Sequence, residues 1–208
     1  MTPLSAFDSV QHILCLGAHS DDIEIGVGGT VLRLLQARPQ LRISWVCFSG
    51  EPARAAEAKA SANAFAPNVT YVAHTFADRY FPSQHLEIKK SFDVLKVVEP
   101  DLIFTHSLDD KHQDHRVINE LTWNAFRSHQ ILEYEIPKWD GDLQRPNVYV
   151  TLDKPIVDRK IDLLLTHFGT QRGKHWFDDE TFRALARLRG LESNARYAEA
   201  FVARKMVI

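Results

Sequence analysis

Short apolar runs alternate with longer segments of helical periodicity over the first 128 residues. A short apolar run bounded by turn residues is typical of a buried strand, and apolar residues at every third or fourth position are typical of a helix. The predicted strands of this part cover residues 11–18, 41–48, 69–73 and 101–105. The predicted helices follow them, from the glycines at 26–29 to about residue 38, over 52–65, over 84–98, and after residue 115 to about residue 128.

This alternation predicts an α/β fold with a Rossmann-like, mostly parallel, doubly wound sheet and flanking helices. In the common strand order 3-2-1-4, the first and fourth strands are neighbours, and the winding reverses between them. The rest of the chain is predicted as strands over 131–136, 148–152 and 199–208, helices over 154–168 and 179–191, and a loop over 137–146. We expect a single domain over residues 1–208, because this length suits one core.

Composition narrows the class of protein without deciding it. The chain is 45% apolar and 25% charged, which is ordinary for a globular protein. A net charge of −2 gives no electrostatic basis for binding nucleic acid. No signal sequence and no apolar stretch of membrane length is evident, so we expect a cytoplasmic protein without a membrane span. The sequence is compatible with an oligomer but does not indicate one.

Two clusters of His and Asp follow the first and fourth predicted strands. His19, Asp21 and Asp22 form the first, and His112, Asp114 and His115 form the second. Ligands of α/β proteins bind at the carboxyl ends of strands where the winding reverses, so we expect the clusters to meet. Imidazole and carboxylate are the ligands of catalytic zinc, which uses three of them. The sequence therefore predicts one divalent metal ion per chain, and zinc and Fe²⁺ both suit these ligands.

Other interpretations remain open at this point. An Asp after a strand often caps the next helix, and a His on a helix is often solvent-exposed. Two His and one carboxylate also hold iron in oxygenases, although those usually have antiparallel β barrels. The run Gly26-Val27-Gly28-Gly29 lacks the spacing of a phosphate-binding loop. It fits close packing of a helix on a strand or an anion-binding nest equally well.

The chain resembles the LmbE-like (PIG-L) zinc-dependent N-deacetylases. The segment Ala18-His-Ser-Asp-Asp-Ile-Glu24 with its glycines is similar to the first motif of that family, and His112-Gln-Asp-His115 is similar to the second, H-x-D-H. The resemblance covers nearly the whole chain. Ser20 stands where the family usually has Pro, which loosens the turn but removes no ligand.

The resemblance implies a role for each motif residue. His19, Asp22 and His115 would hold zinc. Asp21 would be the general base for the attacking water, and His112 would stabilise the oxyanion or protonate the departing amine. Asp114 would orient His112, as a carboxylate does for a catalytic imidazole. The reaction would remove an N-acetyl group from a small-molecule or glycan-linked amino sugar of the N-acetylglucosamine type.

Further residues could contact the substrate, and some alternatives concern the reaction itself. The candidate contacts are Arg54, Asp78, Arg79 and Trp139. Arg54 could instead form an exposed ion pair with Glu57, and Trp139 could pack in the core. The sequence assigns no role to Glu24, Glu57 or His106. The same site could cleave a non-sugar amide or a thiol-sugar conjugate, or could bind metal without catalysis.

Overall fold

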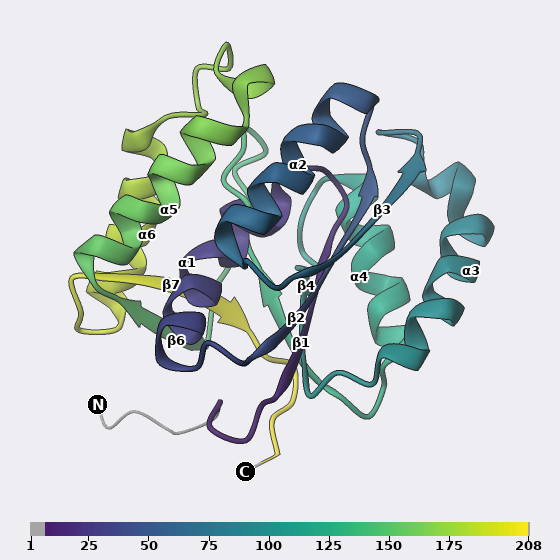
Figure 1. Cartoon of the computed structure of the whole chain (residues 1–208), viewed down its shortest axis with the longest axis horizontal. Helices are drawn as coiled ribbons and strands as arrows, with labels where there is room; N and C mark the ends of the chain where they lie inside the picture. The colour runs from purple at the N-terminus through teal and green to yellow at the C-terminus, as the bar shows by residue number, and fades with distance from the viewer. Residues whose placement is uncertain (1–6, 208) are drawn as a thin grey trace.

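The fold is one seven-stranded, mostly parallel sheet with helices on both faces, in the computed structural model that describes residues 7–207 (Figure 1). The strands are β1 (His12–Gly17), β2 (Arg42–Ser49), β3 (Thr70–Phe76), β4 (Leu102–His106), β5 (Gln130–Tyr134), β6 (Val148–Leu152) and β7 (Tyr197–Val202). The α-helices are α1 (Asp22–Ala37), α2 (Pro52–Phe65), α3 (His85–Leu95), α4 (Gln113–Ala125), α5 (Lys154–His167) and α6 (Asp179–Glu192). Short 3₁₀ helices are η1 (Phe81–Gln84), η2 (Lys96–Val98) and η3 (Gly169–Gln171).

The strands follow the order β3-β2-β1-β4-β5-β7-β6. The first five of that row run parallel, whereas β7 is antiparallel to both β5 and β6. The predicted order 3-2-1-4 is therefore confirmed, and the winding reverses between β1 and β4. The carboxyl ends of these two neighbouring strands lie side by side, and they carry the two His/Asp clusters.

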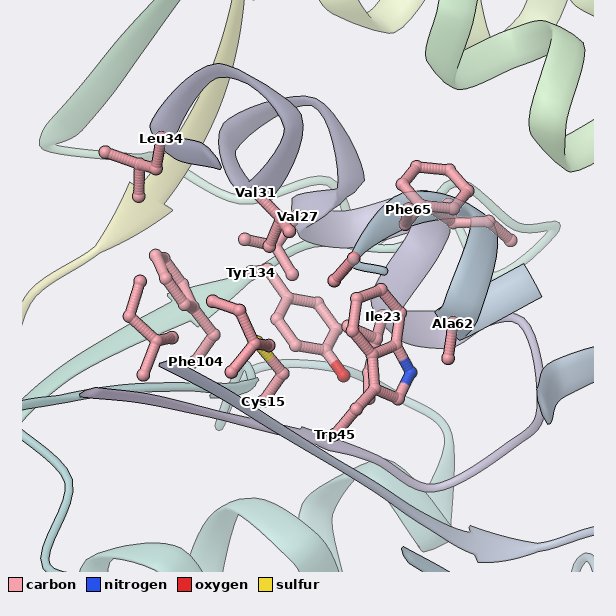
Figure 2. Close-up of a cluster of buried hydrophobic side chains, with 14 of the residues drawn as sticks. Cys15, Ile23, Val27, Val31, Leu34, Trp45, Ala62, Phe65, Phe104 and Tyr134 are labelled. Carbon is pink, nitrogen blue, oxygen red and sulfur yellow. The ribbon is translucent and has the colours of Figure 1, made fainter. Parts of the chain in front are cut away.

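Two apolar layers hold the helices to the sheet. On one face α1, α2, α5 and α6 cover a large core, and on the other face α3 and α4 cover a smaller one (Figure 1). Figure 2 shows the larger core, where Val27 and Val31 of α1 and Phe65 of α2 pack with Trp45 and Tyr134 of the sheet. Both faces are buried because each crossover returns a helix to the sheet.

The glycine run lets α1 lie unusually close to its neighbours. A Cβ on Gly26 would overlap the ring of Tyr134, and one on Gly28 would lie 2.6 Å from Cε1 of Phe65. Of the two interpretations of this run, the structure supports close helix packing. The close approach sets the first turn of α1 directly at the end of β1.

Several element boundaries differ from the predictions. α1 begins at Asp22 rather than at the glycines 26–29, and β5 ends at Tyr134 rather than at residue 136. β3 extends to Phe76 rather than ending at residue 73, which places His74 in the strand. α4 ends at Ala125, because Phe126 leaves helical geometry and packs into the core. The last strand covers Tyr197–Val202 rather than 199–208, since its bounds follow its pairing with β6. Ile208 lies outside the described residues. Among the helices of residues 7–207, none has the length and apolar character needed to cross a membrane.

Candidate metal centre

The two His/Asp clusters meet at the carboxyl ends of β1 and β4. The turn between β1 and α1 carries His19, and the first turn of α4 carries His115. The Nδ1 atom of His19 lies 3.1 Å from Nε2 of His115, although the residues are 96 positions apart. The fold thus produces the convergence that the strand order implies.

Three side-chain atoms form a triangle of the size that a small cation requires. Oδ2 of Asp22 lies 3.3 Å from Nδ1 of His19 and 3.6 Å from Nε2 of His115. A tetrahedral ion with bonds near 2.0–2.1 Å separates its ligands by about 3.3–3.4 Å. All three residues are buried, and burial lowers the pKa of His115 to about 3, which keeps its imidazole neutral. Burial also lowers the pKa of His19, but the charge of Asp22 and the hydrogen bonds to neighbouring carboxylates outweigh it and raise that pKa well above its usual value. Neutral imidazole is the metal-binding form, so these residues fit a divalent cation that displaces the proton of His19.

Carboxylates hold the outer nitrogens of both imidazoles. Nδ1 of His115 donates to Oδ2 of Asp110 at 2.8 Å, and the buried ammonium of Lys138 lies 3.1 Å from the same oxygen. Nε2 of His19 lies 3.0 Å from Oδ1 of Asp78. Such contacts fix ring orientation and are usual around metal ligands. Sequence reasoning missed Asp110 and Lys138, and only the position of Asp110 within the His106–His115 segment pointed to it.

Asp21 lies beside the triangle but is not part of it. Its side chain is buried, and burial raises the pKa of its carboxyl. The guanidinium of Arg54 opposes that rise, with Nη2 at 2.9 Å from Oδ1 of Asp21. A carboxylate held next to the metal-ligand triangle, with a cation to keep it ionised, can accept a proton.

His112 caps the N-terminus of α4. Its Nδ1 accepts the backbone N–H of Asp114 at 3.2 Å, which leaves Nε2 free of the cap. Burial lowers the pKa of His112. The positive charge of a protonated His19 lowers the same pKa further. The side chain of Asp114, expected against His112, instead contacts His19: its Oδ2 lies 3.3 Å from Nε2 of His19. Within residues 7–207, no hydrogen bond joins the Asp114 carboxylate to His112.

Other combinations of side chains could also hold a cation. His112 has a nitrogen close enough to join His19 and His115, and His106 could join Asp22 and His115. His106 Nε2 lies 3.1 Å from Oδ2 of Asp22, and its ring stacks on His115 with centroids 3.8 Å apart. The same nitrogen accepts the N–H of Ala18, so His106 also positions the turn after β1.

Comparison with known proteins identifies the family. The model of PIG-L, described as GlcNAc-PI de-N-acetylase, matches residues 14–126, which is more than half of the 208 residues. The chain belongs to the PIG-L family. The matched segment contains both clusters, most of β1 and all of β2, β3 and β4.

Solved structures share the fold of this PIG-L chain over nearly all of its length. The N,N′-diacetylchitobiose deacetylase of Pyrococcus horikoshii has a TM-score of 0.76 at 20% identity, covering 95% of this chain and 85% of that one. GalB, the 4-carboxy-2-hydroxymuconate hydratase of Pseudomonas putida, scores 0.75 at 20% identity, covering 95% and 98%. The zinc-inhibited form of the teicoplanin deacetylase Orf2 scores 0.71 at 12% identity, covering 94% and 100%. At these identities the likeness establishes the fold, which serves more than one reaction.

The predicted substrate contacts differ in how they relate to the candidate metal centre of this PIG-L chain. Asp78 is brought to it, where the hydrogen bond from His19 lowers the pKa of Asp78 to about 2. Arg79 reaches it through its backbone N–H, which donates to Asp114. Trp139 is 72% exposed on the loop next to Lys138, and its ring meets the edge of His175 with centroids 5.2 Å apart.

The structure shows the environments of Glu24 and Glu57, two acidic residues to which the sequence assigned no role. Glu24 is fully buried, and neither of its carboxylate oxygens has a hydrogen-bond partner among the described residues. Glu57 accepts both the N–H and the hydroxyl of Thr170, at 2.9 and 2.6 Å. Glu57 thus ties α2 to η3, and the ion pair of Arg54 is with Asp21 rather than with Glu57.

Proposed function

We propose that this chain is a divalent-metal-dependent hydrolase that removes the N-acetyl group of an amino sugar of the N-acetylglucosamine type. One observation carries the proposal: His19, Asp22 and His115 meet at tetrahedral spacing, and a separate buried carboxylate, Asp21, lies beside them. The family model, described as a de-N-acetylase, supports the same reaction.

The same three residues would hold zinc or Fe²⁺, because both ions accept imidazole and carboxylate ligands. A bound cation would supply Lewis acidity, which makes a water molecule more acidic and polarises the amide carbonyl. Asp110 and Asp114 would keep the two imidazoles oriented, through the contacts at 2.8 and 3.3 Å.

Hydrolysis then needs two proton transfers from this chain's own groups. Asp21 would take a proton from the attacking water as it adds to the acyl carbon, and Arg54 would keep Asp21 ionised until then. Nε2 of His112 would donate a hydrogen bond to the oxyanion. The C–N bond breaks when Asp21 returns that proton to the amine nitrogen, and the products are acetate and a free amine.

We also propose that the substrate is a sugar with a further group attached. Arg54, Asp78 and Arg79 offer charged groups for hydroxyls or a negative substituent. The exposed indole of Trp139 offers a flat apolar surface, which stacks well on the apolar face of a pyranose. We therefore expect a glycoside to bind better than the free monosaccharide.

Acetate release from a panel of substrates tests the proposal. The panel contains free N-acetylglucosamine, diacetylchitobiose, nucleotide-linked and lipid-linked N-acetylglucosamine, a thiol-sugar conjugate and a simple acetamide. With zinc loaded, we expect turnover of at least one N-acetyl sugar. Asp21→Asn should keep the metal and lose about 10²–10⁴-fold in kcat. Trp139→Ala should raise KM for glycosides with little change in kcat.

Three outcomes would contradict parts of the proposal. Cleavage of the acetamide or the thiol-sugar conjugate alone would assign a different amide substrate. If the protein bound zinc but released acetate from none of these compounds, it would be a metal-binding module rather than a hydrolase. Full turnover in Asp21→Asn would remove Asp21 from the role of base.

A further inference from the structure

We propose that the side chain of Asp114 is a positioning group for the metal ligand His19, and that it does not act through His112. The inference rests on the metal centre of the proposed function, but it concerns which histidine this carboxylate serves. One residue contacts both rings, His112 through its backbone N–H and His19 through its carboxylate.

The Asp114 carboxylate is fully buried and accepts hydrogen bonds from two directions. Oδ2 accepts the backbone N–H of Arg79 at 2.6 Å, and Oδ1 accepts that of Phe81 at 3.1 Å. Oδ2 also faces Nε2 of His19 at 3.3 Å. The two backbone donors fix the carboxylate firmly, so it can in turn fix the ring of His19.

The consequence concerns which nitrogen of His19 carries the proton. A carboxylate only accepts hydrogen bonds, so the proton of the neutral ring belongs on Nε2, facing Asp114 and Asp78. That tautomer leaves the lone pair on Nδ1, the atom that points at Asp22 and His115. Asp78 shares the task, but its side chain is 40% exposed, whereas that of Asp114 is fully buried.

His112 is held independently of the Asp114 side chain. Its Nδ1 accepts the N–H of Asp114 as the cap of α4, a contact that any residue at position 114 can supply. A change confined to the Asp114 side chain therefore separates the two alternatives. In Asp114→Asn an NH₂ group replaces one carboxylate oxygen. The backbone N–H of Arg79 or of Phe81, or the ring of His19, then loses its acceptor.

Zinc affinity, measured by competition with a chromophoric chelator, tests this inference without any substrate. The proteins are the wild type, Asp114→Asn, His112→Ala and the double variant. We expect Asp114→Asn to weaken zinc binding about 10–100-fold in both backgrounds. His112→Ala alone should retain affinity within about threefold of the wild type.

Asp101→Asn is the matched control. Oδ2 of Asp101 also accepts two backbone N–H groups, from Gln11 and His12 at 2.8 and 2.9 Å, but at the opposite end of the sheet. The Asp101→Asn variant should leave zinc affinity unchanged. The inference is overturned if Asp114→Asn binds zinc as tightly as the wild type.

A measurement on the zinc-loaded wild type guards against poor folding of the variant. In ¹⁵N-labelled histidine spectra we expect His19 to bind zinc through Nδ1 and to carry its proton on Nε2. Zinc bound through Nε2 of His19 would overturn the inference. Neither the zinc affinity nor the histidine spectrum depends on acetate release. A protein that binds zinc but does not deacetylate sugars would therefore refute the proposed function without deciding this inference.

Discussion

Glu24 is a carboxyl group buried in the first turn of α1 with no hydrogen-bond partner among the described residues. Burial raises the pKa of Glu24 well above its usual value, so its neutral form is favoured in the folded protein. Such a group lowers the free energy of unfolding at any pH where it is ionised in the unfolded chain but neutral in the folded protein. The cost is absent below the unfolded pKa near 4.3 and grows as the pH rises toward the folded value.

We expect Glu24→Gln to become more stable relative to the wild type as the pH increases from about 4.5 to 7.5. Glutamine has nearly the same shape and no charge to bury, so the variant lacks the pH-dependent cost. Urea unfolding at several pH values, with a chelator present, measures the difference in free energy of unfolding. A difference that stays constant over this range would show that Glu24 titrates alike in the folded and unfolded chain.

At the scale of elements, α1 depends on small residues to reach the sheet. Gly26 faces Tyr134 so closely that a methyl group would overlap the ring. Tyr134 cannot move freely, because its hydroxyl donates to the carbonyl of Leu16 at 2.6 Å. Any displacement of α1 also displaces the proposed ligand Asp22, because this residue begins the helix.

We therefore expect Gly26→Ala to lower the free energy of unfolding by about 1–3 kcal/mol, which is typical of overpacking in a core. Zinc affinity should fall as well, because the ligand Asp22 shifts with the helix. Gly173→Ala is the matched control, since nothing lies within 4 Å of a Cβ placed there. Urea unfolding of both variants decides the point, and equal stability of the two would show that α1 accommodates the methyl group.

The element pattern also shows what a sequence can and cannot specify. The alternation of strands and helices indicated a doubly wound sheet, and the common strand order of such sheets, 3-2-1-4, is the order observed. That order decides which loops meet. The bounds of β7 depend on pairing with β6, and such pairing leaves no local trace. For the same reason Lys138 could not be predicted, because its contact with Asp110 requires the loop after β5 to fold against the loop after β4.

At the scale of the whole molecule, the proposed metal centre joins two segments that only the folded sheet brings together. His19 and Asp22 come from the β1–α1 connection, and His115 comes from α4. The ligand set therefore exists only in the native state, and binding free energy adds to folding free energy. A ligand present at one hundred times its Kd stabilises the native state by about 2.7 kcal/mol.

We expect removal of zinc by a chelator to lower Tm by about 5–10 °C, given about 2–4 °C per kcal/mol for a chain of this size. Restoring zinc should reverse the shift, whereas magnesium should not, because it prefers oxygen ligands. His115→Ala should unfold at the same temperature with and without zinc, because it lacks one corner of the triangle. Scanning calorimetry of the wild type under these conditions, and of His115→Ala with and without zinc, provides the measurement. A zinc-dependent Tm that persists in His115→Ala would place the ion among other residues, of which His19, Asp78, His112 and Asp114 are the nearest set.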